Sequence, residues 1–274
     1  KYNGKVLGIN DNNFCIIVYN NINENVSGNT MTTYIQQLIS RMSDDSYRVG
    51  EKSVDGNYES SKTVSWAAYE EARELKNFDY FDELYNIIDT TESEDIKHNA
   101  YFVLGHNAKN CKDLKATEYL LTKLRKEKNK TLLVTILDRL AELYKPKQFD
   151  ISPIYKLTTN RNWQIRGHAF EALTNNENKV EDFLIDKLNT TDKKDDVRPL
   201  LSSLMYVGTQ KAIPNVEKHL KSRQPFIKSY SINVLTVIML REKFSFETIQ
   251  TKLKVSKDFV QTHFDRLDKL SRPG

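Results

Sequence analysis

The chain has 274 residues, of which 39% are hydrophobic, and a formal net charge of +4. A chain of this length can bury a large core, and it has no run near the roughly eighteen apolar residues that a membrane-spanning helix needs. Its two cysteines, Cys15 and Cys111, are far apart in the sequence, so neither a disulfide framework nor a CxxC motif is indicated.

Residues 1–62 differ from the rest of the chain and are predicted to form an N-terminal appendage. Two short strands are expected at residues 5–9 and 14–19, joined by a turn rich in Asn, and a helix is expected at residues 31–42. Apolar residues are sparse between residues 43 and 62, which favours a mobile loop there. The appendage is therefore irregular or contains a β-hairpin.

Five apolar anchor residues recur from residue 96 onward, at steps of 37, 32, 32 and 30 residues. The anchors are Ile96, Leu133, Ile165, Val197 and Ile227. The positions four, seven and eight residues after each anchor are also apolar, except for Ser231, and these offsets share one face of an α-helix. Each anchor therefore predicts a helix with a buried apolar stripe.

Each anchored helix follows another predicted helix, so the repeating unit is a helical hairpin. The apolar positions of these preceding helices lie within residues 81–88, 119–124, 154–157, 183–188 and 213–220. Hairpins that recur at about thirty residues are typical of an α-solenoid. The sequence thus predicts an all-α fold of about five hairpins over residues 63–242, with a helix at residues 64–75 as the N-terminal cap.

The helix starts resemble those of a known family. Asp196, Val197 and Arg198 are echoed by residues 95–97 and by residues 164–166. Together with the Ala-Ile-Pro run at residues 212–214, they resemble HEAT and bacterial HEAT-like (PBS-lyase-type) repeats over residues 78–242. The second copy departs, because two leucines and a valine replace its acidic-apolar-basic triplet. The resemblance implies a right-handed superhelix whose second helices line the concave side, and a role in binding proteins or, less often, nucleic acid.

The predicted binding surface lies opposite the apolar stripe of the anchored helices. Positions two, five, six and nine after an anchor lie about half a turn from the stripe and are expected to face the concave side. The aromatic and histidine side chains among them are His98, Tyr101, Phe102, Phe170 and Tyr206. Tyr101 and Tyr206 are the expected exposed anchors for a partner, whereas Phe102 and Phe170 could equally pack between hairpins. The main hypothesis is a non-catalytic protein-binding scaffold.

Residues 243–274 are expected to form a final helical hairpin, with helices at residues 246–253 and 257–270. Their apolar spacing resembles the bacterial helix-turn-helix, although Gln250 and Lys254 replace its usual small residue and turn glycine. A polar-faced hairpin that caps the array explains the same pattern, and we favour this interpretation.

Nucleic-acid binding is the first alternative hypothesis. Residues 1–110 carry a net charge of −7 and residues 111–274 a net charge of +11, and a basic region can attract a polyanion. The side chains that would contact phosphates are Lys252, Lys254 and Lys257. Lysines that keep outer helix faces hydrated would give the same asymmetry.

Catalysis is indicated only weakly. No Walker loop, GxGxxG, HExxH or GxSxG motif occurs. His98 and His106 are eight residues apart, which is not metal-ligand spacing, and the histidines are expected at the surface. A HEAT-like alkylpurine DNA glycosylase is the second alternative, because Trp163 and Arg166 resemble part of that family's pattern. That family's Trp-Asp signature is missing, however, and Trp163 is expected to pack at a helix start.

We expect no cofactor, metal, catalytic residue or small-molecule substrate. We also expect a cytoplasmic location, with export left open because the chain begins with Lys1.

Overall fold

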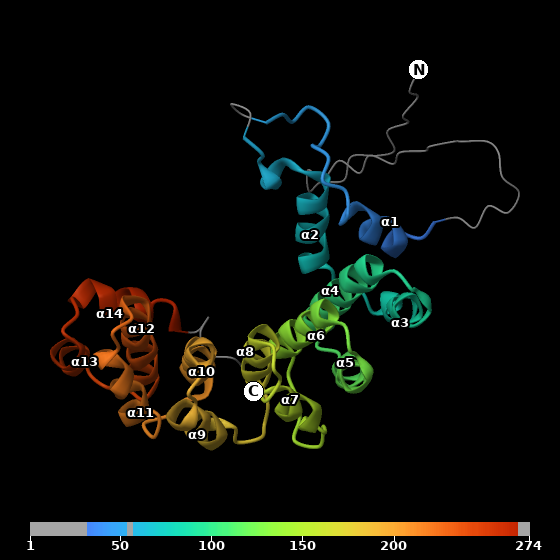
Figure 1. The fold of residues 1–274 in the computed structure, drawn as a ribbon. Coiled ribbons are helices and arrows are strands. Elements are labelled where there is room, and N and C mark those ends of the chain that lie inside the picture. The colour runs from blue at the N-terminus through green and yellow to red at the C-terminus, as the bar shows by residue number, and fades with distance from the viewer. Residues whose placement is uncertain (1–31, 54–56, 268–274) are drawn as a thin grey trace, which may run out of the picture. The chain divides into compact units, whose positions relative to one another are not determined.

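The computed structural model describes residues 32–53 and 57–267, and within these residues the chain is helical or irregular and forms no extended strand (Figure 1). The all-α prediction is therefore confirmed for the described part. The strands predicted at residues 5–9 and 14–19 lie outside the described residues. The chain divides into two units, residues 1–33 and 34–274, and every helix described below belongs to the second unit.

The helices follow one another in the order predicted from the sequence, and the two helices of each predicted hairpin contact each other. Two N-terminal helices come first, α1 (Tyr34–Arg41) and α2 (Val64–Glu74). The first helices of the hairpins are α3 (Phe81–Thr90), α5 (Leu114–Lys126), α7 (Ser152–Leu157), α9 (Glu181–Thr190) and α11 (Ile213–Glu217). The second helices are α4 (Glu94–Cys111), α6 (Lys130–Glu142), α8 (Trp163–Ala172), α10 (Lys194–Val207) and α12 (Pro225–Arg241). The last two are α13 (Phe246–Leu253) and α14 (Lys257–Phe264), and short 3-10 turns occupy Ser60–Lys62, Phe78–Tyr80 and Lys218–Lys221.

Short polar residues fix where many of these helices begin. A side-chain oxygen just before the helix accepts a hydrogen bond from a backbone N–H two or three residues further on, which satisfies one of the free donors at the helix start. The residues that do so are Thr63, Ser93, Asp113, Asn129, Asn162, Ser245 and Ser256. Pro153, Pro214 and Pro225 lie at the first or second helical position, where a missing N–H costs least.

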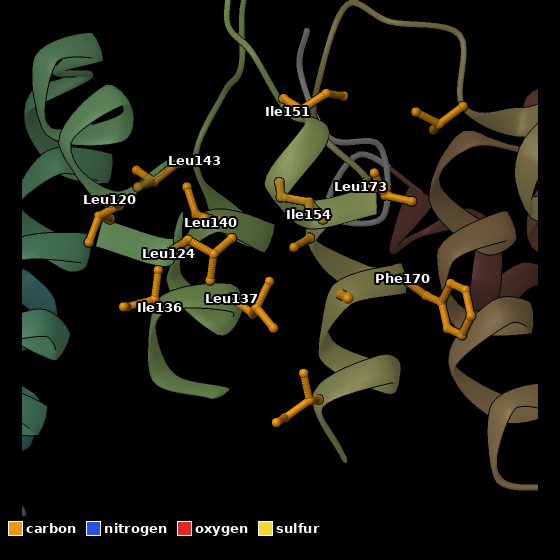
Figure 2. Packing of buried hydrophobic residues seen from close by; sticks show 14 of the residues in the cluster. Leu120, Leu124, Ile136, Leu137, Leu140, Leu143, Ile151, Ile154, Phe170 and Leu173 are labelled. Atoms are coloured by element: carbon orange, nitrogen blue, oxygen red, sulfur yellow. The ribbon is translucent and has the colours of Figure 1, made fainter. Parts of the chain in front are cut away.

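The apolar stripes predicted from the repeat form the core. Of the twenty anchor and offset positions, only Ile96, Val197 and Met205 are not buried. The polar exception, Ser231, is also buried, and its hydroxyl donates to the carbonyl oxygen of Ile227 at 2.8 Å, so the helix itself satisfies it. Figure 2 shows part of this core, where side chains of α5, α6, α7 and α8 gather, among them Leu120, Leu124, Ile136, Leu140 and Ile154.

Neighbouring second helices pack side by side in parallel. Contacts join α4 to α6, α6 to α8, α8 to α10 and α10 to α12. Polar contacts join start to start, as in the pair Arg166 and Asp196, and end to end, as in the pair Lys109 and Glu142. These partners are 30 and 33 residues apart in the sequence, so the period of the sequence repeat is also the period of the packing.

The two flanking elements pack on this helical unit. In α1, Ile35, Leu38 and Ile39 are buried, and the helix contacts α2 and α4, although the predicted boundary at residue 62 assigns it to the appendage. At the other end α13 and α14 both pack against α12. The predicted helix bounds at residues 246–253 are confirmed, and α14 ends at Phe264, while the predicted end at residue 270 lies outside the described residues.

Candidate partner-binding site

Two of the predicted surface aromatics are core residues. Tyr101 is 1% exposed and Phe170 is 2% exposed, so the expected exposure of Tyr101 is wrong, and Phe170 follows the buried alternative. Both lie five residues after an anchor, roughly 115° from the centre of the apolar stripe. Because each second helix has parallel neighbours, burial extends beyond the stripe onto the flanks. Figure 2 shows the Phe170 ring pointing away from Leu137 and Leu140, and burial raises the pKa of Tyr101.

His98 is half-buried and its position is fixed by a hydrogen bond between helices. Its Nδ1 lies 2.8 Å from Oγ1 of Thr135 on α6. That hydroxyl already donates its proton to the carbonyl oxygen of Thr131 at 2.9 Å, so it must accept, and Nδ1 of His98 carries the proton. Burial lowers the pKa of His98, which makes this residue a neutral link between α4 and α6.

Phe102 is the centre of a cluster rather than a free surface aromatic. Its ring packs edge-on against Tyr69, with centroids 4.9 Å apart. The guanidinium of Arg73 lies 5.6 Å from the ring centroid and that of Arg139 lies 5.0 Å from it. These cation–π contacts hold both arginines against the ring, so Phe102 joins α2, α4 and α6.

Arg139 is a buried charged residue, and the absence of a side chain at Gly105 leaves space for it. A Cβ atom at Gly105 would lie 2.5 Å from the Arg139 side chain, so only glycine fits at this point of α4. The guanidinium donates to Nε2 of His106 and pairs with the carboxylates of Asp138 and Glu142. Burial, reinforced by the charge of Arg139, lowers the pKa of His106 to about 4. The expectation that this histidine lies at the surface is therefore wrong.

A hollow opens between α8 and α10, and all its lining residues belong to the predicted binding face. It has a volume of about 140 Å³ and is lined by Glu171, Thr174, Ser202, Ser203 and Tyr206. These residues lie five, six or nine positions after the third and fourth anchors. Tyr206 is half-buried at this hollow. Tyr206 is thus a predicted aromatic side chain that borders a hollow.

The structure also shows a feature that the sequence reasoning missed. Four large apolar side chains in the first turns of parallel helices are exposed: Trp66 of α2 (43%), Ile96 of α4 (41%), Trp163 of α8 (53%) and Phe226 of α12 (58%). We call them the first-turn row. Trp163, expected to pack, is more than half exposed. Its position before the anchor of its helix, off the apolar stripe, was the available signal.

Of the lysines named for the nucleic-acid alternative, all three are exposed and one is paired with an acid. Lys252 pairs with Glu217, with 2.6 Å between the charged atoms. Lys254 occupies the left-handed position that ends α13, at φ 56°. Lys257 begins α14, and that helix also carries the exposed Asp258. The helix that would enter the major groove therefore carries an acid beside its lysine, which weakens its attraction to a polyanion.

Few observations favour catalysis. Arg166, which the glycosylase alternative would use, is buried in a pair with Asp196 at 2.8 Å. Within residues 32–53 and 57–267, no group of three or more His, Cys, Asp or Glu side chains is placed to hold a metal ion.

Among those same residues no helix is long and apolar enough to cross a membrane. No protein-family model matches the chain, and comparison with curated proteins gives no match.

Proposed function

We propose that the chain is a HEAT-like α-solenoid that acts as a non-catalytic scaffold and binds a protein partner across the first turns of its second helices. The solenoid is supported by the parallel packing of successive second helices at the period of the sequence repeat. It is also supported by the pair between Arg166 and Asp196, which joins the helix starts of adjacent repeats. Such arrays present extended surfaces that suit the binding of a partner.

The first-turn row is the observation that carries this proposal. Single exposed apolar residues are common on folded proteins, but these four recur at the same end of parallel helices, so they lie along one edge. Two are tryptophans, the residue type most enriched at the energetic centres of protein interfaces. The guanidinium of Arg198 lies 5.8 Å from the Phe226 ring, so the edge also offers charge. Exposed tryptophans with an arginine on the same edge suit a protein partner.

The test is to remove part of the first-turn row and measure partner capture. The double variant Trp163→Ala, Phe226→Ala should keep its unfolding free energy within about 1 kcal/mol of wild type, because both side chains are more than half exposed. It should lose at least about tenfold in affinity for a partner recovered with the wild-type chain by cross-linking, since each anchor aromatic contributes about 1–2 kcal/mol or more.

A matched control comes from two exposed apolar residues elsewhere. Phe78 is 61% exposed in the turn before α3, and Leu114 is 41% exposed at the start of the first helix α5. The variant Phe78→Ala, Leu114→Ala should bind the partner as wild type does. Equal losses in both double variants, or retention in the first, would refute the proposal. Binding to random duplex DNA that weakens steeply with added salt would instead support the nucleic-acid alternative.

A further inference from the structure

Basic charge is concentrated at the edge where the second helices begin. The helices α6, α8, α10 and α12 lie side by side and in parallel (Figure 1), so their starts form one edge and their ends form another. The nine residues centred on each start hold together eleven Lys or Arg and four Asp or Glu, a net charge of +7. The nine residues centred on each end hold five basic and four acidic residues, a net charge of +1. The start edge is therefore basic, whereas the end edge is nearly neutral.

The cations of the start edge are accessible to a partner. Ten of the eleven are exposed, and in the described part of the chain none of these ten forms an ion pair. The eleventh, Arg166, is buried with Asp196. Of the other three acids, Glu127 accepts hydrogen bonds from two backbone N–H groups at the start of α6, and Asp192 and Asp195 are exposed. The excess positive charge of this edge is therefore not neutralised by the chain itself.

These cations lie among the aromatic side chains of the first-turn row. Arg161 comes two residues before Trp163, and both are exposed. Lys194 opens α10, the helix between the two that carry Trp163 and Phe226. The guanidinium of Arg198, also on α10, lies 5.8 Å from the centroid of the Phe226 ring. Apolar and cationic contacts therefore alternate along the edge from α8 to α12.

From this edge we infer that the part of the partner bound along the first-turn row is an extended acidic peptide segment, an inference that rests on the proposed scaffold function. Its apolar side chains pack on Trp163 and Phe226, and its carboxylates meet the cations between them. Packed helices are about 8–10 Å apart, so the two aromatics are roughly 16–20 Å apart across α10. An extended chain rises about 3.3 Å per residue, so about five or six residues of the segment span this distance.

A nucleic acid fits the same edge less well. The exposed carboxylates of Asp192 and Asp195 flank the cations that open α10. Further along the row, residues 90–98 around the start of α4 hold one lysine and three acids. A phosphate backbone is negative at every nucleotide and is repelled at both places. A peptide can place an uncharged or basic residue there, so the alternation of charge favours a peptide.

The experiment measures binding of small labelled probes to the full chain by fluorescence anisotropy, with a neutral dye. The test peptide is Leu-Glu-Asp-Glu-Asp-Glu-Leu, in which two leucines flank five acids. The comparison peptide is Leu-Lys-Arg-Lys-Arg-Lys-Leu, which has the same spacing and the opposite charge. A third probe is an oligothymidylate of equal length. We expect saturable binding of the acidic peptide that weakens with added salt, no binding of the basic peptide, and weaker binding of the oligothymidylate.

Matched variants locate the binding at the start edge. The double variant Arg161→Glu, Lys194→Glu should bind the acidic peptide at least about tenfold more weakly, because two attractive contacts become repulsive. Both positions lie at helix starts, where an acid is favourable, so its melting temperature should stay near that of wild type. The control is Lys115→Glu, Lys179→Glu, which changes the net charge equally at exposed positions beside the starts of α5 and α9. It should bind the peptide nearly as wild type does, since distant charges are screened.

Each outcome supports or overturns the inference. Equal binding of the acidic and basic peptides, equal losses in the two double variants, or no saturable binding of the acidic peptide would overturn it. Oligothymidylate that binds as tightly as the peptide and competes with it would support the nucleic-acid alternative instead. The scaffold function survives any of the first three results if partner capture still depends on Trp163 and Phe226. Conversely, a chain that binds the acidic peptide through Arg161 and Lys194, but whose partner capture ignores those aromatics, would retain the basic edge and refute the proposed surface.

Discussion

The neutral histidine on α4 predicts a loss of stability in mild acid. In the folded chain the pKa of His106 falls to about 4, against 6.5 for an ordinary histidine, because burial and then Arg139 oppose its protonation. As the pH falls from 7 to 5, the unfolded chain binds a proton that the folded chain does not, so the unfolding free energy decreases. From these two pKa values, the unfolding free energy at pH 5 is about 2 kcal/mol lower than at pH 7, at 1.36 kcal/mol per pKa unit. Local rearrangement around a protonated ring would reduce this to about 1–2 kcal/mol.

The measurement is urea unfolding at several pH values between 7 and 5, for wild type and for His106→Gln. Gln can still accept from Arg139 but does not titrate, so the decline in unfolding free energy should be smaller in the variant by about 1–2 kcal/mol. Leu104→Ala, in the same buried turn, is the control, because it should lower stability similarly at every pH. An unchanged pH dependence in His106→Gln would refute the assignment of a neutral, buried imidazole.

Three further predictions concern packing. Asp196→Ala leaves Arg166 buried without a counter-charge and should cost about 3–5 kcal/mol in urea unfolding, and a loss below 1 kcal/mol would mean that water reaches the arginine. Gly105→Ala places a methyl group 2.5 Å from the buried arginine of α6 and should cost about 1–3 kcal/mol, so an unchanged melting temperature would contradict the close approach. Deleting residues 1–62 removes α1 from its contacts with α2 and α4 and should lower the melting temperature more than deleting residues 1–33, and equal effects would show that α1 adds little to the core.

The helices and the core were predictable because both follow from local spacing. An apolar residue recurring at offsets of four, seven and eight must lie on one helical face, whatever surrounds it. Leu137, Leu140 and Leu204 are buried for this reason. Ile96 shows the limit of the rule, since it has the right spacing but lies in the first turn of α4, where the neighbouring hairpin no longer covers it. Spacing predicts the direction in which a side chain points from its helix. It does not predict whether a neighbouring hairpin covers the helix at that position.

The candidate surface was less predictable because it depends on contacts between repeats. Tyr101 is polar at its tip and lies off the stripe, which predicts exposure, yet the neighbouring helices cover it. Arg139 and His106 give no local signal of burial either, since each needs the other, and the space at Gly105, to be accommodated. The residues around the hollow were nevertheless within the predicted face. Sequence periodicity predicts which residues share this face, and packing between repeats decides which of them are accessible.

The packing between α8 and α10 is close near the helix starts and more open further along, where the hollow lies. Near the helix starts, Arg166 and Asp196 form a buried pair, and the absence of a side chain at Gly167 lets Pro199 approach, since a Cβ at that glycine would lie 3.1 Å from the proline ring. At the next interface, between α10 and α12, the arginine near the helix start, Arg198, faces the Phe226 ring instead. The buried pair of Arg166 and Asp196 therefore lies one to two turns from the hollow, so the two helices are joined closely at their starts and less closely further along.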